Sequence, residues 1–274
     1  MVMPEGMILT FFNSEELLMP TPTVINQWRY SDAINRRSWD NRYFFDDFST
    51  MPVYAGNTGT GLPTGTAGDL NTLQTGFSNF QWNVIGTQTL LTPTWSSTAG
   101  INLAQDQTAA EGMELSAGFS TLTDFQYTVG TDNAFFLKGQ FKTDDVSGCN
   151  PLIIGFRKLA AFNATLSNYT DFVSIGLVGT ADPNTIKIQT QLATGGVTTT
   201  DTTQTLADNT LVTFEINVSS AGVVTYKING SAPTVTAAFT FASGTIVVPF
   251  VRLVQAADLA PNVNCNYLEC GFQS

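Results

Sequence analysis

The sequence contains no histidine among its 274 residues. This absence excludes Ser-His-Asp and Cys-His catalysis and His-ligated zinc, and it removes the commonest general base near neutral pH. Only carboxylates, lysines and tyrosines remain for proton transfer. We therefore expect that the protein is not an enzyme and that it needs no cofactor.

Cysteine is also scarce, with three residues at Cys149, Cys265 and Cys270. An odd number this small does not form a disulfide framework, so we expect synthesis in a reducing compartment and buried, unreactive thiols. Cys265 and Cys270 are five positions apart, which places their side chains on opposite faces of a regular strand.

Long apolar runs and export signals are missing as well. The N-terminus carries Glu5 and only a short apolar run at residues 7–12, unlike a secretory signal. No run approaches the roughly 18 consecutive apolar residues of a membrane helix. We expect a protein that is made in the cytoplasm and has no membrane partner.

Charged residues make up only 12% of the chain, and the net charge is −11. Residues 1–45 hold five acids and four arginines, a net charge of −1, whereas residues 46–274 hold seventeen acids and seven bases, a net charge of −10. Because such an acidic body repels a phosphate backbone, we expect no nucleic-acid partner.

The chain divides into an arm at residues 1–45 and a β-rich body at residues 46–274. The arm shows no strand alternation, and long irregular segments are uncommon inside a compact domain. Within the body, Gly, Thr and Pro dominate residues 55–68, and we expect an exposed loop over 55–76. The predicted strands cover about 79–91, 98–105, 110–118, 122–129, 134–142, 151–157, 170–178, 185–192, 197–206, 211–218, 222–228, 234–241, 245–254 and 264–273.

The clearest local signal is a β-hairpin formed by 211–218 and 222–228 and followed by an Asn-Gly turn. One face of each strand is apolar and the other is polar, as in an antiparallel sheet with one face buried. The apolar set is Phe214, Ile216, Val218, Val224, Tyr226 and Ile228. The polar set is Thr213, Glu215, Asn217, Thr225 and Lys227. With the other strands, the hairpin predicts an all-β antiparallel sandwich.

The carboxylates offer two weak patterns for chemistry. Glycan-cleaving enzymes use two facing carboxylates. Glu111 and Glu114 are the nearest such pair, but positions three apart point to opposite faces of a strand. We interpret them as solvated strand-edge acids. The pairs Asp46-Asp47 and Asp144-Asp145 do not form an EF-hand pattern, so we assign no metal site and place the second pair in a turn.

Four of the six arginines lie in the arm beside aromatic residues. Arginine pairs directionally with carboxylates, and tryptophan and tyrosine give large rigid contact areas, as at interface hot spots. The arm either binds a partner protein or folds back on its own acidic body, and exchange of arms in a trimer would satisfy both. The predicted partner-binding residues are Trp28, Arg29, Tyr30, Arg36, Arg37, Trp39 and Arg42.

Several segments together resemble a known family. The hairpin, the run at 246–253 and the closing strand at 266–272 are similar to the C-terminal half of concanavalin A-like (laminin-G-like) jelly-roll sandwiches. The opening Tyr-Phe-Phe-Asp-Asp-Phe at 43–48 resembles the first strand of such domains in bacteriophage virion proteins. The resemblance covers about 43–274 and leaves the arm outside.

This resemblance implies a virion protein without enzymatic activity. We expect a homotrimeric jelly roll that decorates and cements the exterior of a phage capsid by binding the major capsid protein through its arm. The alternative is a carbohydrate-binding module of a tail fibre or receptor-binding protein, with glycans as partners. In that case Trp82 and Trp95 are the candidate sugar platforms.

Overall fold

The computed structural model describes residues 44–46, 54–55, 73–75, 81–86, 95–96, 99–103, 109–116, 126–179, 181–193, 195–256 and 262–273. Apart from one 3₁₀ turn, η2 (Leu166–Asn168), these residues contain strands, turns and irregular segments. No helix in this part of the chain is long and apolar enough to cross a bilayer.

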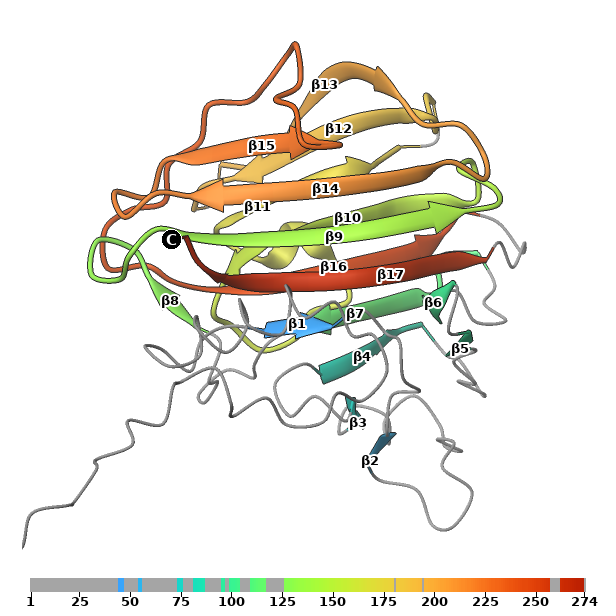
Figure 1. Ribbon diagram of the computed structural model, residues 1–274. Helices are drawn as coiled ribbons and strands as arrows, with labels where there is room; N and C mark the ends of the chain where they lie inside the picture. The colour runs from blue at the N-terminus through green and yellow to red at the C-terminus, as the bar shows by residue number, and fades with distance from the viewer. Residues whose placement is uncertain are drawn as a thin grey trace, which may run out of the picture.

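Two antiparallel sheets lie face to face (Figure 1). The seven-stranded sheet has the order β15-β14-β9-β17-β6-β5, and β1 also pairs with β17. Its strands are β1 (Phe44–Asp46), β5 (Trp95–Ser96), β6 (Gly100–Asn102), β9 (Phe135–Thr143), β14 (Leu211–Val218), β15 (Val224–Ile228) and β17 (Val263–Phe272).

The ten-stranded sheet has the order β13-β12-β11-β10-β16-β7-β4-β3-β2, and β8 also pairs with β16. Its strands are β2 (Tyr54–Ala55), β3 (Leu73–Thr75), β4 (Gln81–Ile85), β7 (Gly112–Ser116), β8 (Tyr127–Thr128), β10 (Cys149–Lys158), β11 (Phe172–Leu177), β12 (Thr185–Gln191), β13 (Thr198–Thr205) and β16 (Ile246–Gln255). The expected all-β sandwich is confirmed.

The core lies between the sheets and is built from alternate residues of each long strand. At one end of the core, the rings of Tyr127 and Phe135 stack with their centroids 4.4 Å apart. Phe156 from the opposite sheet packs edge-on against Phe135 at 5.0 Å. This aromatic contact joins β8 and β10 of one sheet to β9 of the other.

The predicted hairpin is confirmed as β14 and β15. Phe214 pairs with Ile228, and Ile216 pairs with Tyr226. All six residues predicted to share the apolar face are buried, and the residues between them keep partial or full exposure. The alternation alone therefore determines which side of the hairpin faces the core.

Cys265 and Cys270 are buried, as expected, but the strand that carries them is not regular. Both side chains lie in the same core cluster, although five positions separate them. The pairing of β17 with β9 shifts register between Cys265 and Tyr267, which is a β-bulge. The extra residue reverses the inward and outward alternation of the strand, and both thiols therefore point into the core.

Two other expectations also need correction. No strand forms over 234–241, because this segment makes a single isolated bridge, between Thr240 and Val223 just before β15, and a strand requires a continuous ladder. β3 lies inside the range 55–76 that was predicted as a loop, since it pairs with β2 and β4. The boundary between arm and body, at 45/46, falls within β1.

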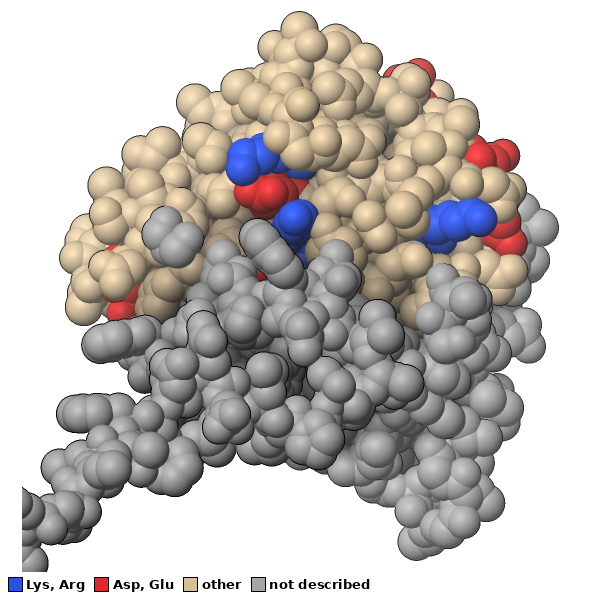
Figure 2. Space-filling model, in the orientation of Figure 1, with Lys and Arg blue, Asp and Glu red and all other residues tan. Residues whose placement is uncertain are grey.

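The outer face of the seven-stranded sheet carries a row of alternating charges. Lys227, Glu215, Lys138 and Glu269 are register neighbours across β15, β14, β9 and β17. Burial raises the pKa of the Glu215 carboxyl, but hydrogen bonds from Lys227 and Asn217 outweigh that effect and hold the pKa below its usual value. Figure 2 shows this face, on which charged side chains form small groups on a largely uncharged surface.

We predict that Ile216→Ala lowers the free energy of unfolding by about 2–5 kcal/mol, because it leaves a cavity in the core. Thr225→Ala lies on the exposed face of the same hairpin and should change that free energy by less than about 0.5 kcal/mol. Urea denaturation measures both variants. Equal effects at the two positions would contradict the assigned faces.

Candidate functional site

The body contains two arginines, Arg157 and Arg252, and both lie on the outer face of the ten-stranded sheet. Arg252 on β16 pairs in register with Glu114 on β7. Antiparallel register partners project from the same face of a sheet, so the arginine and the glutamate are side by side. Arg157 lies on β10, on the other side of β16.

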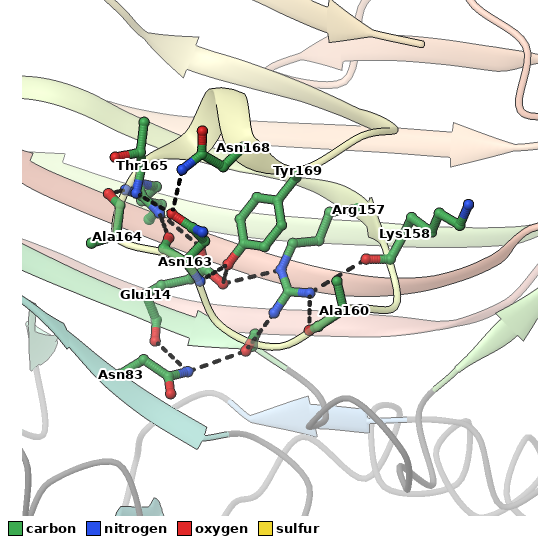
Figure 3. Close-up of polar contacts among 12 residues, drawn as sticks. Asn83, Glu114, Arg157, Lys158, Ala160, Asn163, Ala164, Thr165, Asn168 and Tyr169 are labelled. Carbon is green, nitrogen blue, oxygen red and sulfur yellow. Dashed lines mark hydrogen bonds and ion pairs between the residues drawn. The ribbon is translucent and has the colours of Figure 1, made fainter. Parts of the chain in front are cut away.

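Glu114 is completely buried and accepts three hydrogen bonds (Figure 3). Its Oε1 accepts from Arg157 Nε at 3.1 Å and from the Tyr169 hydroxyl at 3.0 Å. Its Oε2 accepts from Arg252 Nη1 at 3.0 Å. A buried carboxylate is tolerated only when it is paired and hydrogen-bonded in this way.

A segment between β10 and β11, the outer loop (residues 159–171), covers this carboxylate. Tyr169 enters the network from the loop and places its ring 4.4 Å from the Arg157 guanidinium. Its hydroxyl also accepts the backbone N–H of Asn163 at 2.9 Å. Burial and the charge of Glu114 raise the pKa of Tyr169 well above its usual value, so the hydroxyl remains a donor.

Backbone carbonyls of the outer loop engage both guanidinium groups. Arg157 Nη1 donates to the carbonyl of Ala160 at 3.1 Å. Arg252 Nη1 donates to that of Asn163 at 3.1 Å, and Arg252 Nη2 donates to that of Ala164. Because these carbonyls are bound to side chains of the sheet, the loop is fixed on the outer face.

Two glycines allow close approach of neighbouring strands in the ten-stranded sheet near the outer loop. A Cβ atom at Gly155 would lie 2.1 Å from the carbonyl oxygen of Val173, and one at Gly176 would lie 2.0 Å from that of Leu152. Neither position accepts a side chain without displacement of the backbone. Glycine at these two positions therefore permits the observed pairing of β10 with β11.

A pocket beside residues 165–167 of the outer loop has a volume of about 400 Å³. We call it the outer pocket. Its walls come from the outer loop, from β10, β12, β13 and β16, and from residues that flank β11 and β13. The lining residues are Asn150, Pro151, Thr165, Leu166, Ser167, Val178, Gln189, Val197, Thr199, Arg252 and Val254.

Gln189 lines the outer pocket and has an unused hydrogen-bond acceptor. Its Nε2 donates to Thr199 Oγ1 at 3.4 Å, while its Oε1 is buried and has no partner among the described residues. A buried polar atom without a partner costs free energy unless a ligand or water completes it. The amide therefore offers an acceptor at a fixed place in the pocket wall.

Most of the residues that the sequence singled out fall outside the described part of the chain. All seven predicted partner-binding residues of the arm lie outside the described residues. Trp82 and Trp95 lie on β4 and β5, and their side chains also fall outside the described part. Asp144 and Asp145 occupy the turn after β9, as expected, and hold it through Asn262, Ser147 and Gly148.

The interpretation of Glu114 as a solvated strand-edge acid is wrong, because two arginines and a tyrosine enclose it. Its carboxylate is inaccessible and engaged by three donors, so it does not form a pair that could reach a glycosidic bond. Among the described residues, no cluster of three or more His, Cys, Asp or Glu side chains could hold a metal ion.

Sequence reasoning missed the pocket and both body arginines. A signal was available, because Arg157 directly follows the apolar run at 152–156 and Arg252 interrupts the apolar run at 246–254. A cation within such a strand needs a buried partner, and this requirement points to an acid on a neighbouring strand. The sequence does not show that the two cations share one acid.

No family model matches the sequence, and no curated protein matches it. Among solved structures, the fold is similar to a protein of unknown function from Shewanella oneidensis MR-1. The TM-score is 0.51, the identity is 11%, and the match covers 92% of this chain and 95% of that one.

The fold is also similar to two carbohydrate recognition domains. For that of Emp47p, the TM-score is 0.50 at 13% identity, covering 75% of this chain and 93% of the other. For that of Emp46p in a potassium-bound form, the TM-score is 0.50 at 7% identity, covering 75% and 95%. These similarities show a lectin-like β-sandwich fold, which agrees with the concanavalin A-like resemblance.

Two buried tyrosines provide a test of the Glu114 network. Tyr169→Phe removes a hydrogen bond to a charged acceptor and should lower the free energy of unfolding by about 1.5–3 kcal/mol. The Tyr226 hydroxyl is buried in the core and has no partner among the described residues, so Tyr226→Phe should be neutral or stabilise by about 1 kcal/mol. Urea denaturation measures both, and a Tyr226→Phe variant less stable than Tyr169→Phe would contradict the assignment.

Proposed function

We propose that this protein binds carbohydrate and that the sugar occupies the outer pocket. The observation that carries the proposal is the combination of fixed polar groups and apolar walls in one preformed pocket. Its volume of about 400 Å³ falls within the range usual for small-ligand sites, roughly 300–1,000 Å³.

The polar groups suit the hydroxyls of a sugar. Thr165, Ser167 and Thr199 present hydroxyls, each of which can donate and accept. The unpartnered Oε1 of Gln189 adds an acceptor that is already desolvated. A sugar hydroxyl that donates to this oxygen would remove the cost of leaving it unpaired.

The apolar walls suit the C–H faces of a pyranose ring. Pro151, Leu166, Val178, Val197 and Val254 line the pocket beside the polar groups. No aromatic side chain is among the described lining residues, so this site differs from the tryptophan platforms that the sequence suggested. Aliphatic side chains can still exclude water from the ring and strengthen the polar contacts around it.

The pocket is held in shape before any ligand binds. The outer loop contributes Thr165, Leu166 and Ser167, and the buried arginines fix this loop to the sheet. Gln191 Nε2 adds a further bond to the carbonyl of Ser167 at 3.1 Å. Preorganisation of this kind reduces the entropy lost on binding. The similarity in fold to two carbohydrate recognition domains supports the same proposal.

We predict that Gln189→Leu and Thr199→Val weaken sugar binding about three- to tenfold, since each removes one neutral hydrogen-bonding group. A glycan array identifies a bound sugar, and calorimetry measures its dissociation constant. The matched controls are Gln140→Leu and Thr213→Val, because those residues form the same amide-to-hydroxyl pair on the opposite sheet at 3.2 Å.

The controls should bind the sugar as the unaltered protein does. Two results would overturn the proposal: the absence of any bound glycan, or equal weakening by substitutions on both sheets.

A role in a phage virion, as a capsid decoration or receptor-binding protein on the exterior, is a second proposal. Its support is the composition of the arm, in which four arginines accompany two tryptophans and two tyrosines over residues 28–43. A docking arm and a glycan pocket are compatible, because they involve different parts of the chain. Partner identity and trimeric assembly belong to this proposal.

We predict that changing Arg29, Arg36, Arg37 and Arg42 together to lysine reduces attachment to purified capsids at least tenfold. Lysine keeps the charge but loses the bidentate pairing of the guanidinium group. Cosedimentation measures the occupancy, and the unaltered protein is the reference. Unchanged occupancy in a variant that lacks residues 1–42 would contradict a docking role for the arm.

A further inference from the structure

We infer that the outer pocket recognises a sugar that carries a carboxylate, with Arg252 as the partner of that carboxylate. The inference rests on the proposed function, because it specifies the chemical class of carbohydrate that the same pocket would take. Charge, geometry and the composition of the pocket walls each support it.

The buried network has an uncompensated positive charge. Glu114 is its single carboxylate, whereas Arg157 and Arg252 are both cations, and all three side chains are at most 3% exposed. Backbone carbonyls of the outer loop solvate the guanidinium groups but carry no net charge. An anion bound beside Arg252 would balance the network, and the low local dielectric would strengthen the attraction.

The position of Arg252 leaves it able to bind a ligand. Its Nη1 donates to Glu114 and Asn163, and its Nη2 donates to Ala164. Its Nε makes no hydrogen bond to the described residues, and the side chain forms part of the pocket wall. An arginine supplies five N–H donors, so this one keeps donors in reserve while its guanidinium is already oriented.

The surrounding side chains favour the same class of ligand. No Asp or Glu is among the described residues that line the pocket. Lys187 is in register with Arg252 across the sheet, because Arg252 pairs with Ile153, Ile153 with Gly176 and Gly176 with Lys187. It therefore adds a second cation to this face. Asp201 is the register neighbour of Lys187 on β13, and its carboxylate accepts the backbone N–H of Thr203.

The walls also distinguish a sugar acid from a simple inorganic anion. The pocket is several times larger than an anion needs, and Pro151, Val178, Val197 and Val254 give it an apolar surface. Those groups would gain nothing from free phosphate, whereas they match the ring of a uronic acid. The net charge of −11 on the chain also disfavours unspecific attachment to polyanions.

The experiment compares each acid with its own uncharged ester. The probes are trimers of galacturonic, glucuronic and mannuronic acid and sialyllactose, each also prepared as its methyl ester, together with inorganic phosphate. Calorimetry on the full chain measures the dissociation constants. We expect at least one acid to bind ten times more tightly than its ester.

The charge is probed at Thr199 and not at Arg252, because Arg252 also anchors the outer loop. Thr199→Glu and Thr199→Gln have side chains of similar size at an exposed pocket position, and they lose the same hydrogen bond from Gln189. Thr199→Glu should bind the acid at least ten times more weakly than Thr199→Gln does. The two variants should bind the ester within threefold of each other.

The possible failures are distinguishable. Esters or neutral sugars that bind as tightly as the acids, with the Gln189→Leu weakening intact, would overturn the carboxylate inference and leave the proposed function standing. Phosphate that displaces the acid at equal concentration would reduce the pocket to a general anion site and would also overturn the inference. Absence of binding by every acid and every ester, together with a blank glycan array, would overturn both proposals.

Discussion

The pairing of Glu114 with Arg157 and Arg252 is the constraint on which the outer face of the ten-stranded sheet depends. One carboxylate, 0% exposed, joins β7, β10 and β16 and holds Tyr169 of the outer loop. Removal of one partner from a buried ion pair costs about 3–5 kcal/mol, because it leaves an uncompensated charge. This pairing also holds the outer loop in place, because carbonyls of the loop accept hydrogen bonds from the two guanidinium groups. The loop in turn forms one wall of the outer pocket.

The two outer faces of the sandwich differ in how their charged side chains are arranged and buried. On the seven-stranded sheet, Lys227, Glu215 and Lys138 form a partly exposed row whose charges alternate in sign, and such exposed pairs contribute little to stability. On the ten-stranded sheet, the charges are buried, unequal in number and covered by a loop. A surface built in the second way has a defined shape and a local potential, which are the properties that a binding site requires.

Much of the fold follows from patterns in the sequence. The hairpin at 211–228 was predictable in detail, because period-two alternation and Gly-containing turns are local features. The failures were non-local. The bulge in β17 reversed the face of Cys265 relative to Cys270, and the segment 234–241 found no continuous neighbour with which to pair. Neither the position of a bulge nor the availability of a partner strand is encoded in the segment itself.

The sequence by itself determined the fold class, the inward face of the hairpin at 211–228 and the absence of histidine chemistry. These depend on residue type and on the alternation of side chains along a strand. Only the tertiary structure decided that Glu114 meets Arg157, 43 positions away, and Arg252, 138 positions away. The physical reason is the strand order, which places β16 between β7 and β10 so that one acid lies within reach of both arginines.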